Sequence, residues 1–395
     1  MDLSLCIIVK NEETTLPLTL NSVKNVVDEI VLVDTGSSDR TPEIAREFGA
    51  KVYNFEWCND FAAARNESLK YAKGEWILVL DADEVLVTDI VPQLKRAMKS
   101  DRHLLINLIR QEIGAVQSPY SLVSRLFRNH PKIHFSRPYH AMVDDSITEI
   151  ITWELQWKIV SLPSVAILHS GYKAGAIAAK NKLQKAQIAM ESYLAEHPSD
   201  AYVCSKLGAL YVTIGEIQRG MALLKRGLTV VSIDATVLYE LHYHLGIAYR
   251  QQQNFPKAKE HYQAALKLDI LPQLKLGAYN NLGNLLKDEG NLHGAKSLYE
   301  TALQLDPNLA TGYYNLGMTL KALGNFGDAI AAYQKAIDLN PDAAETYQNL
   351  GVVLLKIGKV TESLAAFKQA IALHEVNNPA EAQRLRGGLQ EMGLN

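Results

Sequence analysis

The sequence predicts two parts with different folds: an α/β domain with a Rossmann-like, mostly parallel sheet, followed by an all-α solenoid. Two observations support this prediction. Residues 1–175 alternate short apolar runs of β type with helical patterns, which is typical of a parallel sheet covered by helices. Residues 201–376 repeat at a nearly fixed period, which indicates stacked pairs of helices.

The N-terminal part contains four apolar runs with the composition of buried strands. They cover 3–9, 29–34, 51–57 and 76–81. Helical patterns follow them at 13–27, 41–49, 60–73 and 89–100. Further strand candidates lie at 104–112, 124–129 and 165–172. In such sheets ligands bind outside the carboxyl ends of the strands, which is where this chain carries the polar clusters "KNEE", "DTGSSDRT" and "DADE".

Three copies of a helix–turn–helix pattern align in the C-terminal part. Their Leu-Gly pairs lie at 282–283, 316–317 and 350–351, 34 residues apart. The pattern resembles the tetratricopeptide repeat, in which glycine and alanine let paired helices approach closely while leucine and tyrosine fill the space between them. Two weaker copies near 207–208 and 245–246 bring the expected number to about five.

The same patterns predict the domain boundaries. We expect an α/β domain at 1–175, a helical linker at 176–200, the repeats at 201–376 and a capping helix at 377–395. The cap is expected because the last repeat of a solenoid needs a polar outer face.

The composition is that of an ordinary globular protein. The 395 residues are 48% hydrophobic, and the net charge of −3 provides no basic field for nucleic acid. No stretch approaches the ~20 apolar residues of a membrane span, so we expect at most peripheral membrane contact. The three widely spaced cysteines form no disulfide or zinc pattern and favour a cytoplasmic location.

The stretch "WILVLDADEVL" (76–86) brings three carboxylates to the end of a buried apolar run. Like charges about 4 Å apart repel by roughly 4 kcal/mol at an effective dielectric of about 20, so the cluster needs a partner. In an extended segment Asp81 and Asp83 point to the same side, where a Mg²⁺ or Mn²⁺ ion could bind them. The alternative is a solvated acidic turn before the helix expected near 89.

Two further side chains are candidates for contacts with a nucleotide. Asp34 ends its predicted strand and could accept hydrogen bonds from a base or ribose. Arg65 follows three alanines in "NDFAAARNESL", and arginine suits contact with a phosphate or base. A salt bridge from Arg65 to Asp81 or Asp60 is the alternative.

Taken in order, the motifs resemble a glycosyltransferase of family 2. The motifs that carry this resemblance are "VDEIVLVDTGSSDRTPEIAREFGAKV", "WCNDFAAARNESL", "EWILVLDADE", "YHAMVDD" and "HSGY", over about residues 1–170. With the repeats, the chain resembles a bacterial and cyanobacterial subgroup. The resemblance implies a GT-A fold, a nucleotide-diphosphate sugar as donor with a UDP-sugar as the first candidate, a divalent metal (Mg²⁺ or Mn²⁺) and inverting transfer. His169 in "HSGY" becomes a candidate metal or diphosphate ligand, although an isolated histidine is usually structural.

Carried over by motif, the resemblance also implies roles for single residues. Glu12 and Asp34 would bind the nucleotide base, and Arg65 would face the nucleotide. Asp81 would contact the ribose or the metal, and Asp83 the metal and the diphosphate.

The catalytic base is the position where this chain departs from the family. Many relatives have His-Glu where "YHAMVDD" has His140 and Ala141. Asp144 and Asp145 are the nearest replacements, and we expect at most one of them to point into the cleft. Both could instead cap a turn, and Glu84 is then the next candidate.

These observations favour an inverting glycosyltransferase whose repeats bind a protein or glycan acceptor. One alternative is a non-enzymatic tetratricopeptide scaffold with a degenerate first domain, which Ala141 favours and the intact "DADE" opposes. A nucleotidyltransferase is the second alternative, but the loop after the first strand lacks the glycine-rich basic sequence that such enzymes carry.

Overall fold

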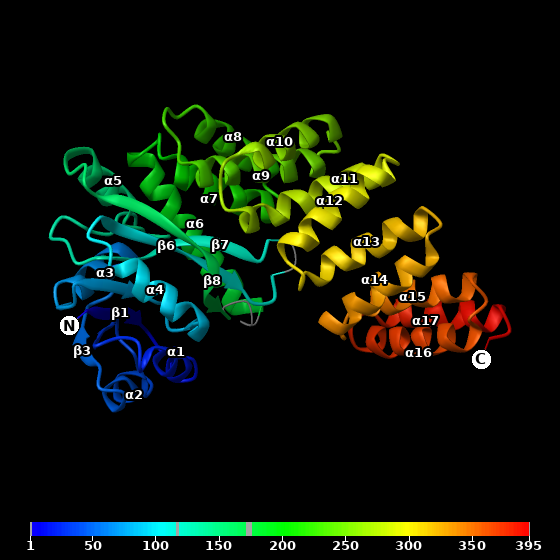
Figure 1. Cartoon of the computed structure of the whole chain (residues 1–395), viewed down its shortest axis with the longest axis horizontal. Coiled ribbons are helices and arrows are strands. Elements are labelled where there is room, and N and C mark those ends of the chain that lie inside the picture. The colour runs from blue at the N-terminus through cyan, green and yellow to red at the C-terminus, as the bar shows by residue number, and fades with distance from the viewer. Residues whose placement is uncertain (1, 116–117, 171–175, 395) are drawn as a thin grey trace. The chain divides into compact units, whose positions relative to one another are not determined.

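The computed structural model describes residues 2–115, 118–170 and 176–394, with the backbone alone for 176–182 (Figure 1). The chain divides into two compact units, residues 1–237 and 238–395. The division falls inside helix α9 (Ala235–Gln251), so the first helices that follow the sheet belong to the first unit. The last two residues of the strand predicted at 165–172 lie outside the described residues.

The described part of the first unit contains one sheet of eight strands in the order β3-β2-β1-β4-β7-β6-β8-β5. The strands are β1 (Leu3–Val9), β2 (Glu29–Asp34), β3 (Lys51–Asn54), β4 (Trp76–Val79), β5 (Glu84–Leu86), β6 (His103–Glu112), β7 (Tyr120–Arg128) and β8 (Lys158–His169).

The predicted α/β fold is confirmed, with a parallel half and a mixed half. Strands β3, β2, β1 and β4 are parallel to one another, and β6 is parallel to β8. Strand β7 is antiparallel to β4 and β6, and β5 is antiparallel to β8. Only residues 113–119 separate β6 from β7, and a parallel pair needs a crossover of about a dozen residues or more, so this pair must be antiparallel.

Helices cover both faces of the sheet and contribute apolar side chains to its two cores. On one face, α1 (Leu16–Val23), α2 (Thr41–Glu47) and α4 (Val91–Met98) contribute to one apolar core. On the other face, α3 (Phe61–Leu69) and α5 (Asp144–Trp153) contribute to a second core.

Among the described residues, α6 (Ala176–Glu196) is followed by five helix pairs and a last helix. The pairs are α7 (Ala201–Thr213) with α8 (Ile217–Leu228), α9 with α10 (Phe255–Lys267), α11 (Leu276–Asp288) with α12 (Leu292–Leu305), α13 (Ala310–Ala322) with α14 (Phe326–Leu339), and α15 (Ala344–Lys356) with α16 (Val360–Asn377); α17 (Pro379–Glu391) follows.

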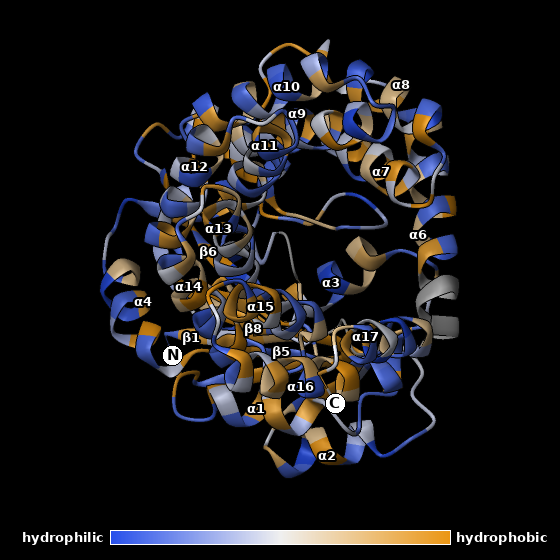
Figure 2. Ribbon diagram, turned by 90° about the vertical axis from the view of Figure 1, so that its right-hand side faces the viewer, coloured by the Kyte–Doolittle hydropathy of each residue, from blue (hydrophilic) through white to orange (hydrophobic). Residues whose placement is uncertain are grey.

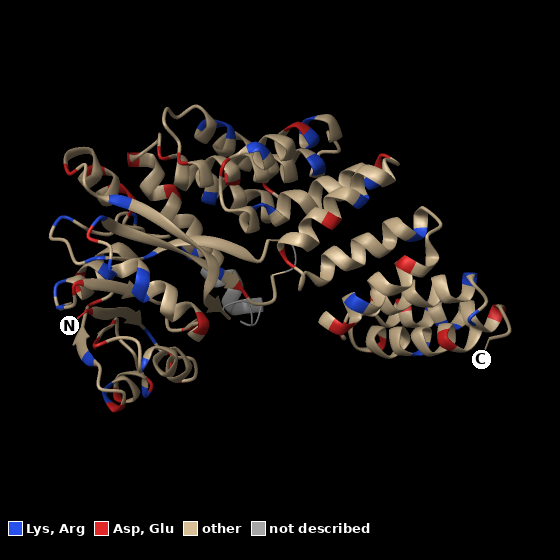
Figure 3. Cartoon of the chain, viewed as in Figure 1, with Lys and Arg blue, Asp and Glu red and all other residues tan. Residues whose placement is uncertain are grey.

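Apolar and polar residues alternate along the paired helices (Figure 2). Acidic and basic residues are interspersed along the chain (Figure 3), in keeping with its small net charge. In the described ranges, no helix combines the length and the apolar character that crossing a membrane requires.

Candidate active site

The polar clusters of the sequence lie along one edge of the sheet. Strands β2, β1 and β4 are parallel neighbours, so their carboxyl ends meet at the same edge. The Glu12 loop follows β1, Asp34 is the last residue of β2, and Asp81 follows β4. The structure therefore brings these three predicted residues to one side of the domain.

The loops that carry Glu12 and Asp34 are held together by hydrogen bonds. The carboxylate of Asp34 accepts from the backbone N–H of Gly36 and Ser37 and from the hydroxyl of Ser37. Glu12 accepts from the Thr15 hydroxyl at 2.6 Å, and its backbone N–H donates to the Thr41 hydroxyl at 2.7 Å. Both carboxylates thus shape the loops at the sheet edge.

Asp81 lies between two arginines. Its Oδ1 is 2.6 Å from Nη2 of Arg65, and its Oδ2 is 2.7 Å from Nη2 of Arg125. Burial alone would raise the pKa of Asp81, but the positive charges of Arg125 and Arg65 outweigh it and hold that pKa well below its ordinary value. Of the two partners that the sequence offers for Arg65, the structure selects Asp81. Asp60 instead caps α3, where its carboxylate accepts from the N–H of Ala63.

Both arginines retain unused donors. Nε and Nη1 of Arg65, and Nη1 of Arg125, are buried and have no hydrogen-bond partner among the described residues. Burial, followed by the neighbouring Arg125, lowers the pKa of Arg65. A buried donor without a partner costs about 1–3 kcal/mol, so an anion that reached these groups would bind favourably. Arginine donors of this kind suit phosphate oxygens.

The segment that carries Asp81 and Asp83 is not extended, and the two carboxylates bind different partners. The segment was assumed to be extended, whereas Ala82 and Asp83 form a turn. The N–H of Glu84 donates to the carbonyl of Asp81, and the N–H of Asp81 donates to the Glu84 carboxylate. The alternation of an extended strand therefore does not apply.

Glu84, which the sequence offers as a reserve base, is fully buried in β5. Its Oε1 is 2.9 Å from Nη1 of Arg110 and 3.8 Å from Nη2 of Arg125. Arg110 also binds Glu112 at 2.7 Å. Glu84 is thus occupied in holding the arginines at the strand ends.

Asp83 is paired with His169. The His169 Nε2 lies 3.2 Å from Oδ2 of Asp83, and its Nδ1 lies 2.5 Å from Oε2 of Glu112. The hydrogen bonds that the imidazole donates, first to Asp83 and then to Glu112, raise the pKa of His169 to about 9.

Asp83 and His169 could bind a divalent cation that takes its remaining ligands from other groups. Metal-binding histidines commonly donate their second nitrogen to a carboxylate, as the contact of His169 with Glu112 allows. In the described part of the chain no group of three or more histidine, cysteine, aspartate or glutamate side chains could hold a metal. Mg²⁺ usually takes one or two carboxylates and completes its shell with phosphate and water, so Asp83 and His169 form a suitable partial set.

Asp144 and Asp145 begin α5 but lie in different environments. Oδ1 of Asp144 accepts from the Ser124 hydroxyl at 2.7 Å, whereas its Oδ2 is buried without a partner among the described residues. Burial raises the pKa of Asp144 to about 6, against the opposing hydrogen bond from Ser124. Asp145 is exposed and paired with Arg137 at 2.6 Å.

A β-bulge links Asp144 to the arginines. Between Leu126 and Val123 the register of β7 against β6 shifts, so that Ser124 and Arg125 together face Asn107. Such a bulge changes the direction of a side chain next to it. Ser124 can therefore reach Asp144 while the adjacent Arg125 reaches Asp81.

No role in the site was predicted from the sequence for Arg110, Glu112 or Arg125. All three lie inside or at the end of runs that were assigned as strands only. Charged residues within apolar strands were the available signal, because such residues are seldom buried without a partner.

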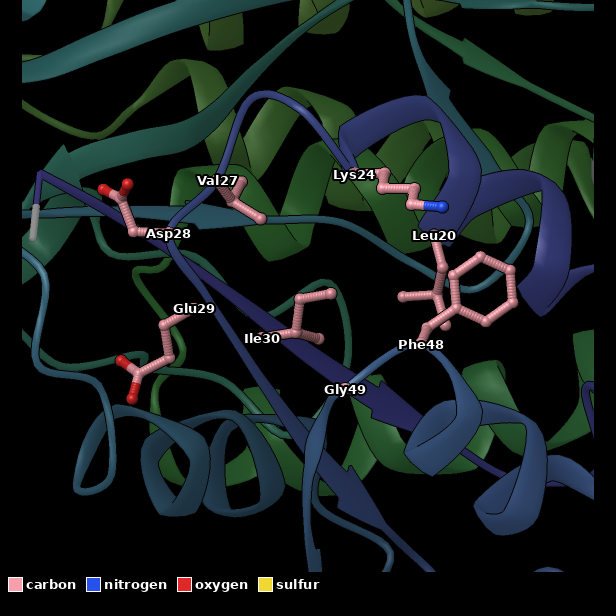
Figure 4. A pocket seen from close by; sticks show the side chains of 8 residues that line it. All are labelled: Leu20, Lys24, Val27, Asp28, Glu29, Ile30, Phe48 and Gly49. Atoms are coloured by element: carbon pink, nitrogen blue, oxygen red, sulfur yellow. The ribbon is translucent and has the colours of Figure 1, made fainter.

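Two hollows of the surface lie elsewhere. The first, about 190 Å³, lies at the amino end of β2 and is lined by Leu20, Lys24, Val27, Asp28, Glu29, Ile30, Phe48 and Gly49 (Figure 4). The second, about 290 Å³, lies beside the C-terminal part of α3 and the end of β7. Neither hollow is lined by Glu12, Asp34, Asp81 or Asp83.

Comparison with known families agrees with both parts of the chain. The profile described as "Glycosyl transferase family 2" matches residues 4–152. Tetratricopeptide-repeat profiles match 239–269, 283–324, 317–358 and 343–377.

Individual relatives match parts of the chain. The "TPR repeat-containing protein Synpcc7942_0270" of Synechococcus elongatus is 44% identical over 73% of this chain and 72% of its own length. An "Uncharacterized glycosyltransferase" of Rickettsia bellii is 30% identical to this chain. The match covers 45% of this chain and 63% of the length of that protein. Among solved structures, "YrrB: a TPR protein with an unusual peptide-binding site" is 20% identical to this chain, with a TM-score of 0.40. The match covers 50% of this chain and 98% of the YrrB chain.

Proposed function

Since this chain belongs to the family that joins a glycosyltransferase family 2 domain to tetratricopeptide repeats, we propose that it is an inverting glycosyltransferase. It moves a sugar from a nucleotide-diphosphate sugar, of which a UDP-sugar is the first candidate, to an acceptor. The observation that carries the proposal is the cluster at the strand ends. There, arginine donors are buried without a partner among the described residues, and Arg110, which binds Glu84 and Glu112, links them to the Asp83–His169 pair.

The diphosphate of the donor is the group that this cluster suits. Arg65 and Arg125 offer N–H groups to its oxygens, and Asp81 keeps both guanidinium groups in place. Asp83 and His169 would hold a Mg²⁺ or Mn²⁺ ion, which supplies neutralisation of the negative charge that develops on the leaving diphosphate. Glu12 and Asp34 shape the loops that face the nucleotide base.

Asp144 is the proposed base. It takes the proton from the acceptor hydroxyl as that oxygen forms a bond to the anomeric carbon. The bond from the anomeric carbon to the diphosphate breaks, and its electron pair leaves with the diphosphate. A pKa near 6 suits a group that must be ionised at neutral pH and still accept a proton, and general-base help is worth roughly 10²–10⁴-fold.

The repeats would bind the acceptor, either a protein or a molecule that carries a glycan. Helix pairs of this kind bury surface only against their neighbours, which leaves long faces for a partner. We place the reaction in the cytoplasm, because the three cysteines are free and suit a reducing compartment.

A non-catalytic scaffold is the alternative function, and Ala141 is the observation that favours it. Its methyl group packs against the apolar core below α3 and α5. If transfer is absent in every assay while the repeats still bind a partner, the scaffold is the better description.

A donor screen tests the proposal. The thermal unfolding of the full chain is followed with UDP and UDP-sugars, each with Mn²⁺ and each with a chelator. A ligand at 100 times its dissociation constant stabilises by about 2.7 kcal/mol. We expect stabilisation that depends on the metal, and no response to any nucleotide diphosphate, including guanosine and thymidine forms, would contradict the proposal.

Asp144→Asn tests the base with the donor that the screen identifies. The change keeps the size of the side chain and removes its ability to accept the proton. Release of UDP should fall by about 10² or more, with donor affinity nearly unchanged. Glu149→Gln, an exposed change on the same helix, is the matched control and should leave turnover unaltered. Wild-type turnover in Asp144→Asn would place the base elsewhere.

A further inference from the structure

The side chain of Arg137 joins three segments of the first unit. It lies in the loop between β7 and α5 and is 8% exposed. Its Nη1 and Nη2 donate to the two carboxylate oxygens of Asp145, at 2.6 and 3.1 Å. Its Nε donates to Oδ2 of Asp200 at 2.8 Å, and the guanidinium lies over the Tyr202 ring, 5.2 Å from its centre.

Both carboxylates that Arg137 binds lie at the beginning of a helix. Asp145 is in the first turn of α5, directly after Asp144. Asp200 is the N-cap of α7 and accepts from the N–H of Val203 at 2.9 Å. One guanidinium therefore connects the start of the helix that carries the proposed base to the start of the first paired helix.

The backbone of the loop depends on these contacts. Arg137 has a φ of 73°, in the left-handed region that residues other than glycine seldom adopt. Such a conformation is strained and persists only where the surroundings hold it. The two ion pairs supply that hold, together with the hydrogen bonds that close the loop between Ser136 and Met142.

We infer that Arg137 is a positioning residue, which fixes the start of α5, and with it the Asp144 carboxylate, to the N-terminus of α7. The inference rests on the proposed function, since it gives Asp144 the role of base. Asp144 makes one described side-chain hydrogen bond, from Ser124, and its second oxygen has no partner in the described chain. Its place therefore depends on where α5 begins.

A misplacement of about 1 Å in such a group can cost 10²-fold in rate. The helix pair α7–α8 thus acts on catalysis through one arginine, without touching the donor. Arg137 contacts neither Asp83 nor the arginines that bind Asp81, so the donor should bind equally well without it.

Two substitutions remove the link from opposite sides. Arg137→Ala deletes the guanidinium. Asp200→Asn removes the charge but keeps a side chain that caps a helix about as well as aspartate, so α7 keeps its start. Both are made in the full chain, alone and combined with Asp144→Asn. Turnover is measured as release of UDP from the donor of the screen, and donor affinity by calorimetry with UDP and Mn²⁺.

We expect each single change to lower turnover by roughly 10- to 100-fold, with UDP affinity unchanged. In the Asp144→Asn background neither change should lower turnover further, because residues that act as one unit are not additive. Arg219→Ala, which removes an arginine that pairs with Glu191 and Glu216 away from this loop, is the matched control and should leave turnover unaltered.

The outcomes separate this inference from the proposed function. Full turnover in Asp144→Asn contradicts the proposed base. Loss in Asp144→Asn with full turnover in Asp200→Asn overturns the positioning role even if Arg137→Ala fails to fold. Losses that multiply in the double variants, or a weakened affinity for UDP, mean that Arg137 supports the fold in general, and they overturn the inference as well.

Discussion

The two units bury different kinds of contact. In the second unit, a glycine of the first helix of a pair meets an aromatic ring of the second helix, and this contact recurs: Gly283 with Tyr299, Gly317 with Tyr333 and Gly351 with Phe367. In the first unit, buried charges from α3, the segment after β4, and strands β5, β6 and β7 form one network that occurs once. A repeated contact is visible in the sequence as a period, whereas a single network leaves no such pattern.

The difference has an energetic consequence. Loss of one side chain from a buried charge network leaves a partner uncompensated, while a change in the repeats strains one contact among several similar ones. We therefore expect the largest effects in the first unit and smaller, local effects in the second.

Arg110→Met should produce the largest effect on stability. It leaves Glu84, which is fully buried, without its closest positive partner. Breaking a buried ion pair in this way costs about 3–5 kcal/mol. All four tryptophans lie in residues 1–237, so their fluorescence during denaturant unfolding reports the first unit. Arg96→Met, an exposed change on α4, is the control; equal stability of the two variants would contradict the network.

Asp83→Asn should have the largest effect on turnover. It keeps the shape of the side chain but removes the charge that the metal needs. Loss of one group that stabilises developing charge costs about 10²–10³-fold, or 2.7–4 kcal/mol. Asp89→Asn, exposed and close in sequence, is the control. Wild-type activity that persists in a chelator would exclude this role of Asp83.

Gly283→Ala should destabilise the second unit by about 1–3 kcal/mol. A Cβ at this position would lie 2.6 Å from the Tyr299 ring, so the helices must move apart. Hydrogen exchange of α11 and α12 measures the change locally. Gly327→Ala is the matched control, since its Cβ would meet nothing within 4 Å, and the higher helix propensity of alanine should stabilise α14 by about 0.5–1 kcal/mol.

Asp144→Asn should have the smallest effect on stability, and that effect should depend on pH. The pKa of Asp144 is raised from 3.8 to about 6, so its burial as a charged group opposes folding above about pH 6 and not below about pH 4. The variant should therefore be more stable than wild type at pH 8, by at most the ~3 kcal/mol that this rise in pKa represents, and this gain disappears as the pH falls from 6 to 4. A difference that does not change with pH would contradict a buried carboxylate.

The sequence was sufficient where a local pattern carries the information. Strands β1 and β2 begin and end where the apolar runs predict, because alternating or continuous apolar residues fix which segment fills a sheet. The repeats were predictable for the same reason, because each copy repeats the residues that make the same contact between its two helices. The edge of the sheet that carries Glu12, Asp34 and Asp81 followed from the predicted parallel arrangement, because each of these residues lies at the carboxyl end of a strand.

Other features were decided by residues that are distant in the sequence. The turn at Ala82–Asp83 sends Asp83 to His169 and leaves Asp81 to Arg65 and Arg125. Apolar periodicity describes one segment at a time, so it could not show that Arg125 comes from a bulged strand. It also could not show that Arg137 ties Asp145 to Asp200.

The sequence by itself thus determined the two folds, the family and the kind of side chain at the strand ends. The tertiary structure decided which of these charges meet, because the Coulomb energy of a pair depends on the distance and burial that only the folded chain sets. For this reason adjacent residues of like charge, Asp144 and Asp145, differ in environment. One is a buried carboxylate with a raised pKa, and the other is half of an ion pair with Arg137.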